Sequence, residues 1–169
     1  MRQETGFNLH VINSDGTGLE QVTFNQSHDR NPTVLSTGEI MFARWDHVGN
    51  RNHFPIFFTN PDGTNIFVQY GAFSPGNSFL HPREMPDGRV LSALMPLSGT
   101  REGGALVAVD IRNFSENDEP ASNTVPAESK GQQQVTLFDI EFGRGISEFG
   151  RYTTPYPLWD GTPRALVSW

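Results

Sequence analysis

The densest cluster of chemically versatile side chains lies in the segment RWDHVGNRNH, residues 44–53. Asp46, His47 and His53 supply one carboxylate and two imidazoles, which could hold a divalent metal ion or line a polar pocket. The simpler interpretation is a long hairpin loop with local arginine–aspartate pairing, and it is favoured because no H-E-x-x-H spacing is present. No cofactor is therefore predicted. A divalent metal is kept as a hypothesis for these three residues, and Arg44 joins them as a ligand-binding candidate.

Two shorter clusters, H-D-R and H-P-R-E, each stand before a glycine turn. The first contributes His28 and Arg30, and the second contributes His81 and Arg83. If the fold places these connections around a central channel, the four side chains face a ligand there. The alternative, which the sequence favours, is a polar connector whose side chains cap neighbouring strands.

Other patterns associated with catalysis are missing. Without cysteine the sequence provides no disulfide, thiolate metal ligand or cysteine nucleophile, and it contains neither G-x-S-x-G nor a Walker motif. No catalytic residue is predicted. Turn formation explains the four aspartates that precede a glycine, which are Asp15, Asp62, Asp87 and Asp160. Tyr152, Tyr156 and Trp159 could form a peptide- or sugar-binding rim, although packing between sheets explains them more simply.

Composition limits the partners that these side chains could serve. The chain has 169 residues, a length typical of one domain, and a formal net charge of −7. An acidic chain without a basic stripe argues against nucleic acid as a partner. No apolar run reaches the ~18 residues of a membrane span, so membrane insertion is not expected. The first ten residues, MRQETGFNLH, also lack the apolar stretch of a signal peptide.

The elements that would position these residues are short strands that recur along the chain. An apolar run leads into N-x-D-G-T, an x-Pro follows, and a glycine turn then precedes a second apolar strand. The same order returns about 50 residues later and, in distorted form, near the end. It defines three approximate repeats, 7–45, 54–95 and 104–169. The third repeat is lengthened by the polar segment 113–131, which is predicted to be a surface insertion.

Local sequence favours strands over helices. Asp-Gly supplies the positive φ angles of tight hairpins, and runs such as IFFTN and ALVAVD have the composition of strands. The proline before each glycine turn suits a connection or a sheet edge because it removes a backbone donor. The sequence predicts an all-β fold, a partial β-propeller of about three four-stranded antiparallel blades or parts of blades, within one domain over residues 1–169. An all-β sandwich with similar turns is the alternative.

These motifs resemble the repeat of TolB-like β-propellers. The matching segments are VINSDGTGLEQVTF, TNPDGTNIFVQYG, HPREMPDGRVLSAL and YPLWDGTPRALVSW. More narrowly, EIMFARWDHVGNRNHFPIFFTNPDGT is similar to the middle propeller domain of proteins related to the hydrazine synthase alpha subunit. The resemblance implies a bacterial, exported and periplasmic protein. It transfers no catalytic residue, because the sequence has no C-x-x-C-H for haem attachment.

Closed propellers have about 4–8 blades, more than this sequence supplies. A segment of a larger ring is therefore expected, completed by the remainder of the same polypeptide or by another copy, and the former is favoured. We expect a non-catalytic binding or scaffold module of a larger bacterial protein, which engages a protein, peptide or small ligand through its rim loops. The alternative is the propeller portion of a multidomain redox enzyme, related to hydrazine synthase alpha, or of a hydrolytic enzyme, with histidines contributed to its site.

Overall fold

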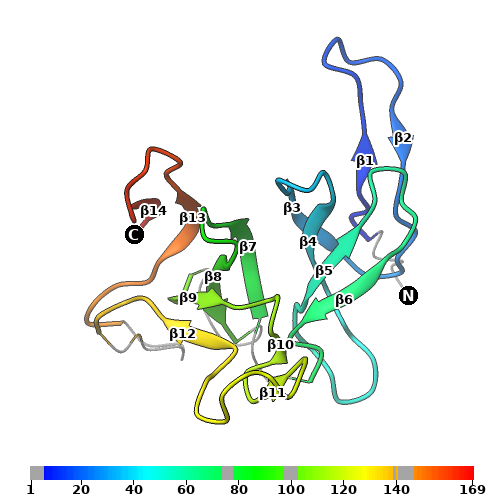
Figure 1. The fold of residues 1–169 in the computed structure, drawn as a ribbon. Coiled ribbons are helices and arrows are strands. Elements are labelled where there is room, and N and C mark those ends of the chain that lie inside the picture. Colours follow the sequence, from blue (N-terminus) through cyan, green and yellow to red (C-terminus); the bar gives the residue numbers. More distant parts are fainter. Residues whose placement is uncertain (1–5, 74–77, 97–102, 139, 141–146) are drawn as a thin grey trace.

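The computed structural model describes residues 6–73, 78–96, 103–138, 140 and 147–169. These residues form strands and no helix (Figure 1), so the predicted all-β fold is confirmed. The strands make several small antiparallel sheets, and none of the described sheets closes on itself. Nothing in the described part of the chain is a helix long and apolar enough to cross a membrane.

The first complete sheet is a four-stranded meander in which each strand pairs with the next along the chain. Its strands are β3 (Asp29–Val34), β4 (Ile40–Arg44), β5 (Ile56–Thr59) and β6 (Phe67–Tyr70). A two-stranded hairpin precedes it, formed by β1 (His10–Val11) and β2 (Glu20–Gln21).

The second complete sheet repeats this meander with one interruption. Its strands are β7 (Ser78–Glu84), β8 (Val90–Met95), β9 (Ala105–Val109) and β12 (Gln132–Gln134). Between its last two strands lies the predicted insertion, with the hairpin of β10 (Phe114–Glu116) and β11 (Glu119–Pro120). Phe114 and Glu116 are buried, so part of the predicted surface insertion packs inside. The last hairpin consists of β13 (Thr153–Pro157) and β14 (Ala165–Ser168).

The first strands of successive sheets lie together. In Figure 1, β3, β7 and β13 lie toward the middle of the molecule, and the later strands of each sheet lie farther out. Strand β7 contacts both β3 and β13. Each sequence repeat therefore begins with the outer two strands of one sheet and ends with the inner two strands of the next.

Apolar side chains on both faces of the central strands pack in three clusters. Neighbouring strand residues point to opposite faces, so Met41 and Phe42 enter different clusters. Met41 packs in the large cluster that joins the two complete sheets, together with Phe58 and Val90. Phe42 packs with Leu9 in a smaller cluster beneath the β1–β2 hairpin. The first complete sheet is thus covered on both faces.

Each first strand carries an x-Pro bulge at the same place. Asn31, His81 and Thr154 have positive φ angles of 56°, 52° and 48°, and the strand pairing shifts register at all three positions. The proline after each of them lies inside the strand, and β3 and β7 are edge strands. The predicted edge position of the prolines is confirmed there. The prediction of a polar connector is wrong for the bulge segments, because a bulge accommodates the proline within the strand.

Aspartate carboxylates hold three of the tight turns. In the β5–β6 turn, Oδ1 of Asp62 accepts hydrogen bonds from Oγ1 and backbone N of Thr64 at 2.7 and 3.0 Å. Asp15 and Asp160 make the same two contacts in the first and last hairpins. The hydroxyl bond, followed by the amide bond, lowers the pKa of all three carboxyls, because both bonds favour the ionised form. The predicted turn role of these aspartates is confirmed.

We expect Asp62→Asn to destabilise the fold at neutral pH and to have no effect in acid. The amide keeps an acceptor oxygen but loses the charge that strengthens both hydrogen bonds. Because the folded-state pKa of Asp62 lies below its unfolded value, the wild-type advantage is complete above about pH 4 and is lost as the pH falls through the folded-state pKa. Urea unfolding of both proteins over a pH series measures this, and a pH-independent difference would contradict it.

Candidate functional site

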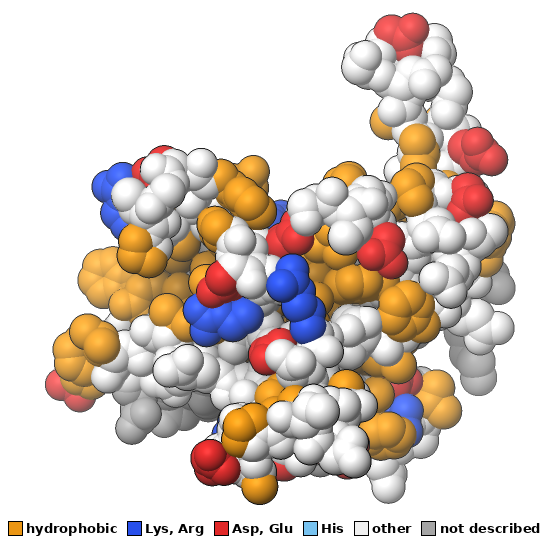
Figure 2. All heavy atoms as spheres, in the orientation of Figure 1, with side chains coloured by type: hydrophobic (Ala, Val, Ile, Leu, Met, Phe, Trp, Pro, Cys, Tyr) orange, Lys and Arg blue, Asp and Glu red, His pale blue; other side chains and the backbone are white. Residues whose placement is uncertain are grey.

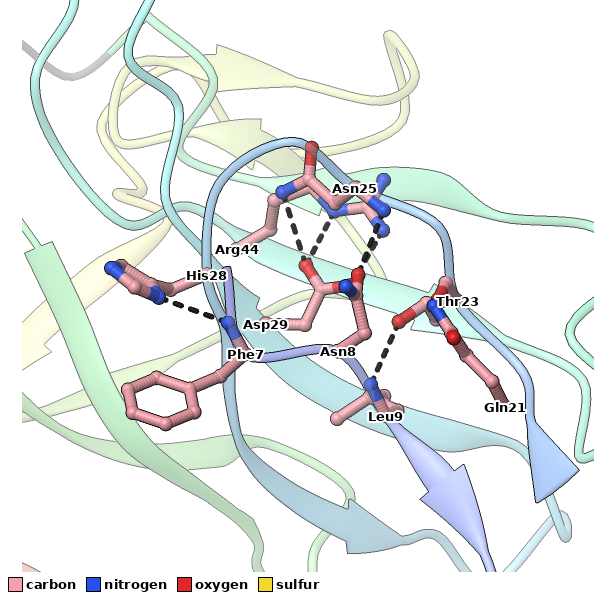
Figure 3. Close-up of polar contacts among 9 residues, drawn as sticks. All are labelled: Phe7, Asn8, Leu9, Gln21, Thr23, Asn25, His28, Asp29 and Arg44. Atoms are coloured by element: carbon pink, nitrogen blue, oxygen red, sulfur yellow. Dashed lines mark hydrogen bonds and ion pairs between the residues drawn. The ribbon is translucent and has the colours of Figure 1, made fainter. Parts of the chain in front are cut away.

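A buried ion pair lies at the start of β3. The carboxylate of Asp29 accepts hydrogen bonds from Nε and Nη2 of Arg44 at 2.7 and 2.8 Å, and the Asp29 side chain is fully buried. Figure 3 shows Asn25 reaching the same carboxylate, with Nδ2 at 3.4 Å. The Arg44 guanidinium also lies over the ring of Phe57 at 5.0 Å. Arg44, a ligand-binding candidate from the sequence, is therefore engaged in contacts that join β3 to β4.

An aromatic stack lies at the same end of the first complete sheet. The imidazoles of His28 and His47 both stack on Trp45, with ring centroids 5.3 and 4.6 Å away and planes within 4° and 10° of parallel. Nδ1 of His28 accepts the backbone amide of Phe7 at 3.1 Å (Figure 3), and Nε1 of Trp45 donates to Asn52. Two candidates from separate sequence clusters, His28 and His47, are thus brought together by one tryptophan.

The three residues considered as metal ligands, Asp46, His47 and His53, do not share a site in the structure. The carboxylate of Asp46 pairs with Arg51 at 3.2 Å, which is the local pairing that the sequence favoured. His47 stacks on Trp45, as described above. The backbone of His53 bridges to Asp46, and its buried ring has an Nε2 atom without a partner among the described atoms. Within the described ranges, no three His, Asp or Glu side chains gather as a possible metal site.

The two clusters before the glycine turns are not equivalent in the fold. Arg30 lies just before the bulge residue Asn31, and its side chain is exposed. Arg83 instead lies after the bulge residue His81, on the other side of the bulge. From the sequence, Arg30 and Arg83 were predicted to have equivalent positions. That prediction is wrong, because superposing the bulges of the two sheets matches Asn31 with His81, so that Arg30 and Arg83 lie on opposite sides of their bulges. Of the four ligand-binding candidates in these two clusters, Arg83 alone lines the cleft described next, where its neighbour Glu84 joins it.

A cleft of about 310 Å³ opens where the inner strands of three sheets end. Its lining comes from the ends of β3, β7 and β13 and from the turns that follow β3 and β13. The lining side chains that could bind a ligand through charge, hydrogen bonds or an aromatic ring are Ser36, Arg83, Glu84, Tyr156 and Trp159. The cleft is therefore shared by three sheets and depends on how the sheets are placed beside one another.

Arg83 lines this cleft with a partly buried guanidinium. Its Nη1 donates to the carbonyl oxygen of Pro82 at 2.8 Å and to that of Asn31 at 3.5 Å. No carboxylate of the described residues forms an ion pair with it. Burial lowers the pKa of Arg83, and the neighbouring Tyr156 opposes this shift, yet an arginine stays charged at neutral pH. A desolvated cation without a counter-ion favours the binding of an anion.

The carboxylate in the same cleft already has two donors. Glu84 accepts hydrogen bonds from the backbone amide and the hydroxyl of Ser36, both at 2.7 Å, and these bonds tie the turn after β3 to the end of β7. Tyr156 and Trp159 are 56% and 59% exposed, so their rings are accessible to a ligand. The cleft thus offers a guanidinium that has no ion-pair partner among the described residues, beside two aromatic rings, an arrangement that could hold a carboxylate attached to an apolar group.

A larger groove of about 650 Å³ lies beside the segment 113–131. Its basic side chains are already paired, Arg89 with Asp87 and Lys130 with Asp118. Because both cations already have counter-ions, this groove is less suited to binding an anion than the Arg83 cleft is.

The sequence singled out part of this cleft and missed the rest. Arg83 was a ligand-binding candidate, and Tyr156 and Trp159 were named as a possible rim. Ser36 was not selected, because nothing in its local sequence marks it, and Glu84 belongs to the H-P-R-E cluster but was not named as a candidate. Their sequence separation of 48 residues is close to the repeat length, which is the signal that could have placed them on adjacent sheets.

Comparisons with known proteins supply no relative. A scan against protein-family models returns no match, and searches of curated proteins and of solved structures return none either.

Proposed function

We propose that this chain is a non-catalytic binding module, a partial β-propeller whose cleft at Arg83 holds a carboxylate-bearing part of a protein, peptide or small molecule. The observation that carries the proposal is a partly buried arginine without a carboxylate partner in the described structure, beside two exposed aromatic rings. Rigid sheets would position the cleft, and the turns after β3 and β13 would form its rim.

The arrangement of the sheets supports the propeller part of the proposal. The inner strands β3, β7 and β13 lie together, and each bends at an x-Pro bulge. Four-stranded meanders whose inner strands meet around a common hollow are typical of propeller blades. Ligands of such folds commonly bind where loops from several blades converge, as loops from two sheets do at this cleft.

The cleft chemistry favours a single carboxylate over a more highly charged anion. A guanidinium binds a carboxylate with two parallel hydrogen bonds. Glu84 lines the same cleft and would repel a dianion such as phosphate more strongly than a monoanion. A volume of about 310 Å³ is near the lower end of known ligand sites, which suits one acidic side chain, a chain terminus or a small acid.

We expect benzoate, a carboxylate on an aromatic ring, to bind this cleft, and Arg83→Gln to weaken the binding about tenfold or more, the loss of one charged hydrogen bond of ~1.5–3 kcal/mol. Two-dimensional amide NMR with the 169-residue chain measures this, with shifts expected at Ser36, Glu84 and Tyr156. Benzamide, which has the same ring without the charge, should bind more weakly. Arg89→Gln, which removes an arginine outside the cleft, is the control and should bind benzoate as the wild type does. Equal binding by the wild type and Arg83→Gln would refute the proposal.

A further inference from the structure

We propose that two copies of this chain associate end to end, with β14 of each copy pairing with β1 of the other to complete two four-stranded sheets. The occupant of each exposed strand edge is thus a second copy of the same chain. The inference rests on strand geometry and goes beyond the proposed ligand, on which it does not depend.

The two end hairpins are complementary halves of a complete sheet. The β13–β14 hairpin carries the x-Pro bulge at Thr154, which marks the inner two strands of both complete sheets. The β1–β2 hairpin carries the N-x-D-G-T turn that joins the outer two strands of the first complete sheet. In that turn Asn13 N donates to Thr17 O, and Asn60 N donates to Thr64 O in the β5–β6 turn, both at 2.9 Å. The last hairpin therefore supplies two inner strands of a sheet, and the first hairpin supplies two outer strands.

The complete sheet β3–β6 also defines the expected register. Val34 pairs with Ile40 next to the turn between β3 and β4, and Pro157 pairs with Ala165 in the same place between β13 and β14. Ala165 therefore corresponds to Ile40.

The turn sequences align the other strand. Ile12 precedes the turn after β1, just as Thr59 precedes the turn after β5. Since Ile40 pairs with Thr59, Ala165 of one copy is expected to face Ile12 of the other. The next pair in this antiparallel register is Leu166 with Val11.

The burial of corresponding residues supports this pairing. Four apolar residues on or directly after the two free edge strands are 39–63% exposed, namely Val11, Ile12, Leu166 and Val167. Their counterparts in the complete sheet are at most 6% exposed, namely Phe58, Thr59, Met41 and Phe42. Figure 2 shows hydrophobic side chains along the β1–β2 hairpin, which stands clear of the rest of the molecule. Pairing between copies would bury these side chains as they are buried inside the chain.

The contact between a D-G-T turn and the end of the preceding sheet also supports the pairing. A Cβ at Gly63, in the β5–β6 turn, would overlap the carbonyl oxygen of Val22, which follows the last strand of the preceding sheet. Gly16 has the same place in the β1–β2 turn, yet nothing lies within 4 Å of its Cβ position. Val135 follows β12 as Val22 follows β2, and it is 48% exposed. In the pair, Gly16 of one copy would lie against Val135 of the other.

The geometry of one chain excludes pairing of its own two ends. In Figure 1, β1 and β14 lie on opposite sides of the molecule, with the two complete sheets between them. The described part of each copy contributes two four-stranded sheets and two end hairpins, so a pair of copies would hold six four-stranded sheets besides its β10–β11 hairpins. This number lies within the ~4–8 blades of closed propellers.

Cysteine crosslinking tests the pairing directly, because the wild-type chain has no cysteine. In Val11→Cys plus Leu166→Cys, mild oxidation should give a covalent dimer on a denaturing gel, and reducing agent should convert that band to monomer. Val11→Cys plus Val48→Cys is the control, since Val48 is 73% exposed in a loop that the pairing leaves free. Equal crosslinking of both variants, or none in the first, would overturn the proposal.

Light scattering after size-exclusion chromatography gives the assembly state. At micromolar concentrations the wild-type chain should elute with twice its mass of 18.8 kDa, and Leu166→Lys should elute as a monomer with an unchanged far-ultraviolet circular dichroism spectrum. The lysine is expected to be tolerated in the monomer because Leu166 is 63% exposed there. A wild-type monomer, a trimer, or a Leu166→Lys dimer would overturn the proposal.

Discussion

Arg44→Met is expected to lower the free energy of unfolding by about 3–5 kcal/mol. Asp29 is fully buried, and Nε and Nη2 of Arg44 are its nearest donors at 2.7 and 2.8 Å. Methionine keeps much of the apolar stem over Phe57 but leaves the carboxylate with only the longer contact from Asn25. The cost arises because a buried charge that loses its partner retains its desolvation penalty. Urea denaturation at pH 7 measures the change.

The exposed ion pair of Arg89 with Asp87 provides a matched control. Its side chains are 39% and 50% exposed, so Arg89→Met should cost at most about 1 kcal/mol. Adding Asp29→Asn to Arg44→Met should restore part of the lost stability, since it removes the unpaired charge. If Arg44→Met costs no more than Arg89→Met, the Asp29–Arg44 pair does not support the fold.

Gly63→Ala should destabilise the chain by about 1–3 kcal/mol more than Gly161→Ala. Both glycines follow an aspartate in a D-G-T turn, with positive φ angles of 78° and 80°. Each alanine pays about 1–2 kcal/mol for the left-handed backbone. A Cβ at Gly63 would in addition overlap the carbonyl oxygen of Val22, a backbone atom that cannot turn aside. At Gly161 nothing lies within 4 Å.

Thermal and urea unfolding of the two variants measure this difference. Because backbone strain is the same at both positions, the difference isolates the packing of the β5–β6 turn against the end of β2. Equal destabilisation of the two variants would mean that the turn does not touch Val22 in solution.

The local parts of this fold could be predicted from sequence, because they depend on neighbouring residues. The D-G-T turns were predicted because Asp-Gly supplies the positive φ angles of tight hairpins, and Gly63 has a φ of 78°. The strands on either side of these turns follow from short β-branched and aromatic runs. The all-β fold needed nothing more than these local preferences.

The candidate cleft could be predicted only in part, because sheets distant in sequence form it. Arg83 was selected for its place in a polar cluster before a glycine turn, but its lack of an ion-pair partner among the described residues depends on what surrounds it in three dimensions. Glu84 finds Ser36 on another sheet, and no local pattern indicates that. The bulges were also missed, since a proline suggests a strand end until a positive φ at Asn31 or His81 makes room for it.

The same bulges limit what can attach to the innermost strands. An uninterrupted row of amide donors on an edge strand is a template for aggregation with other chains. In β3, β7 and β13 the proline removes one donor, and the strand pairing shifts register around the positive-φ residue before it. The inner edges of these three strands, whose ends line the Arg83 cleft, are therefore poor templates for a further strand.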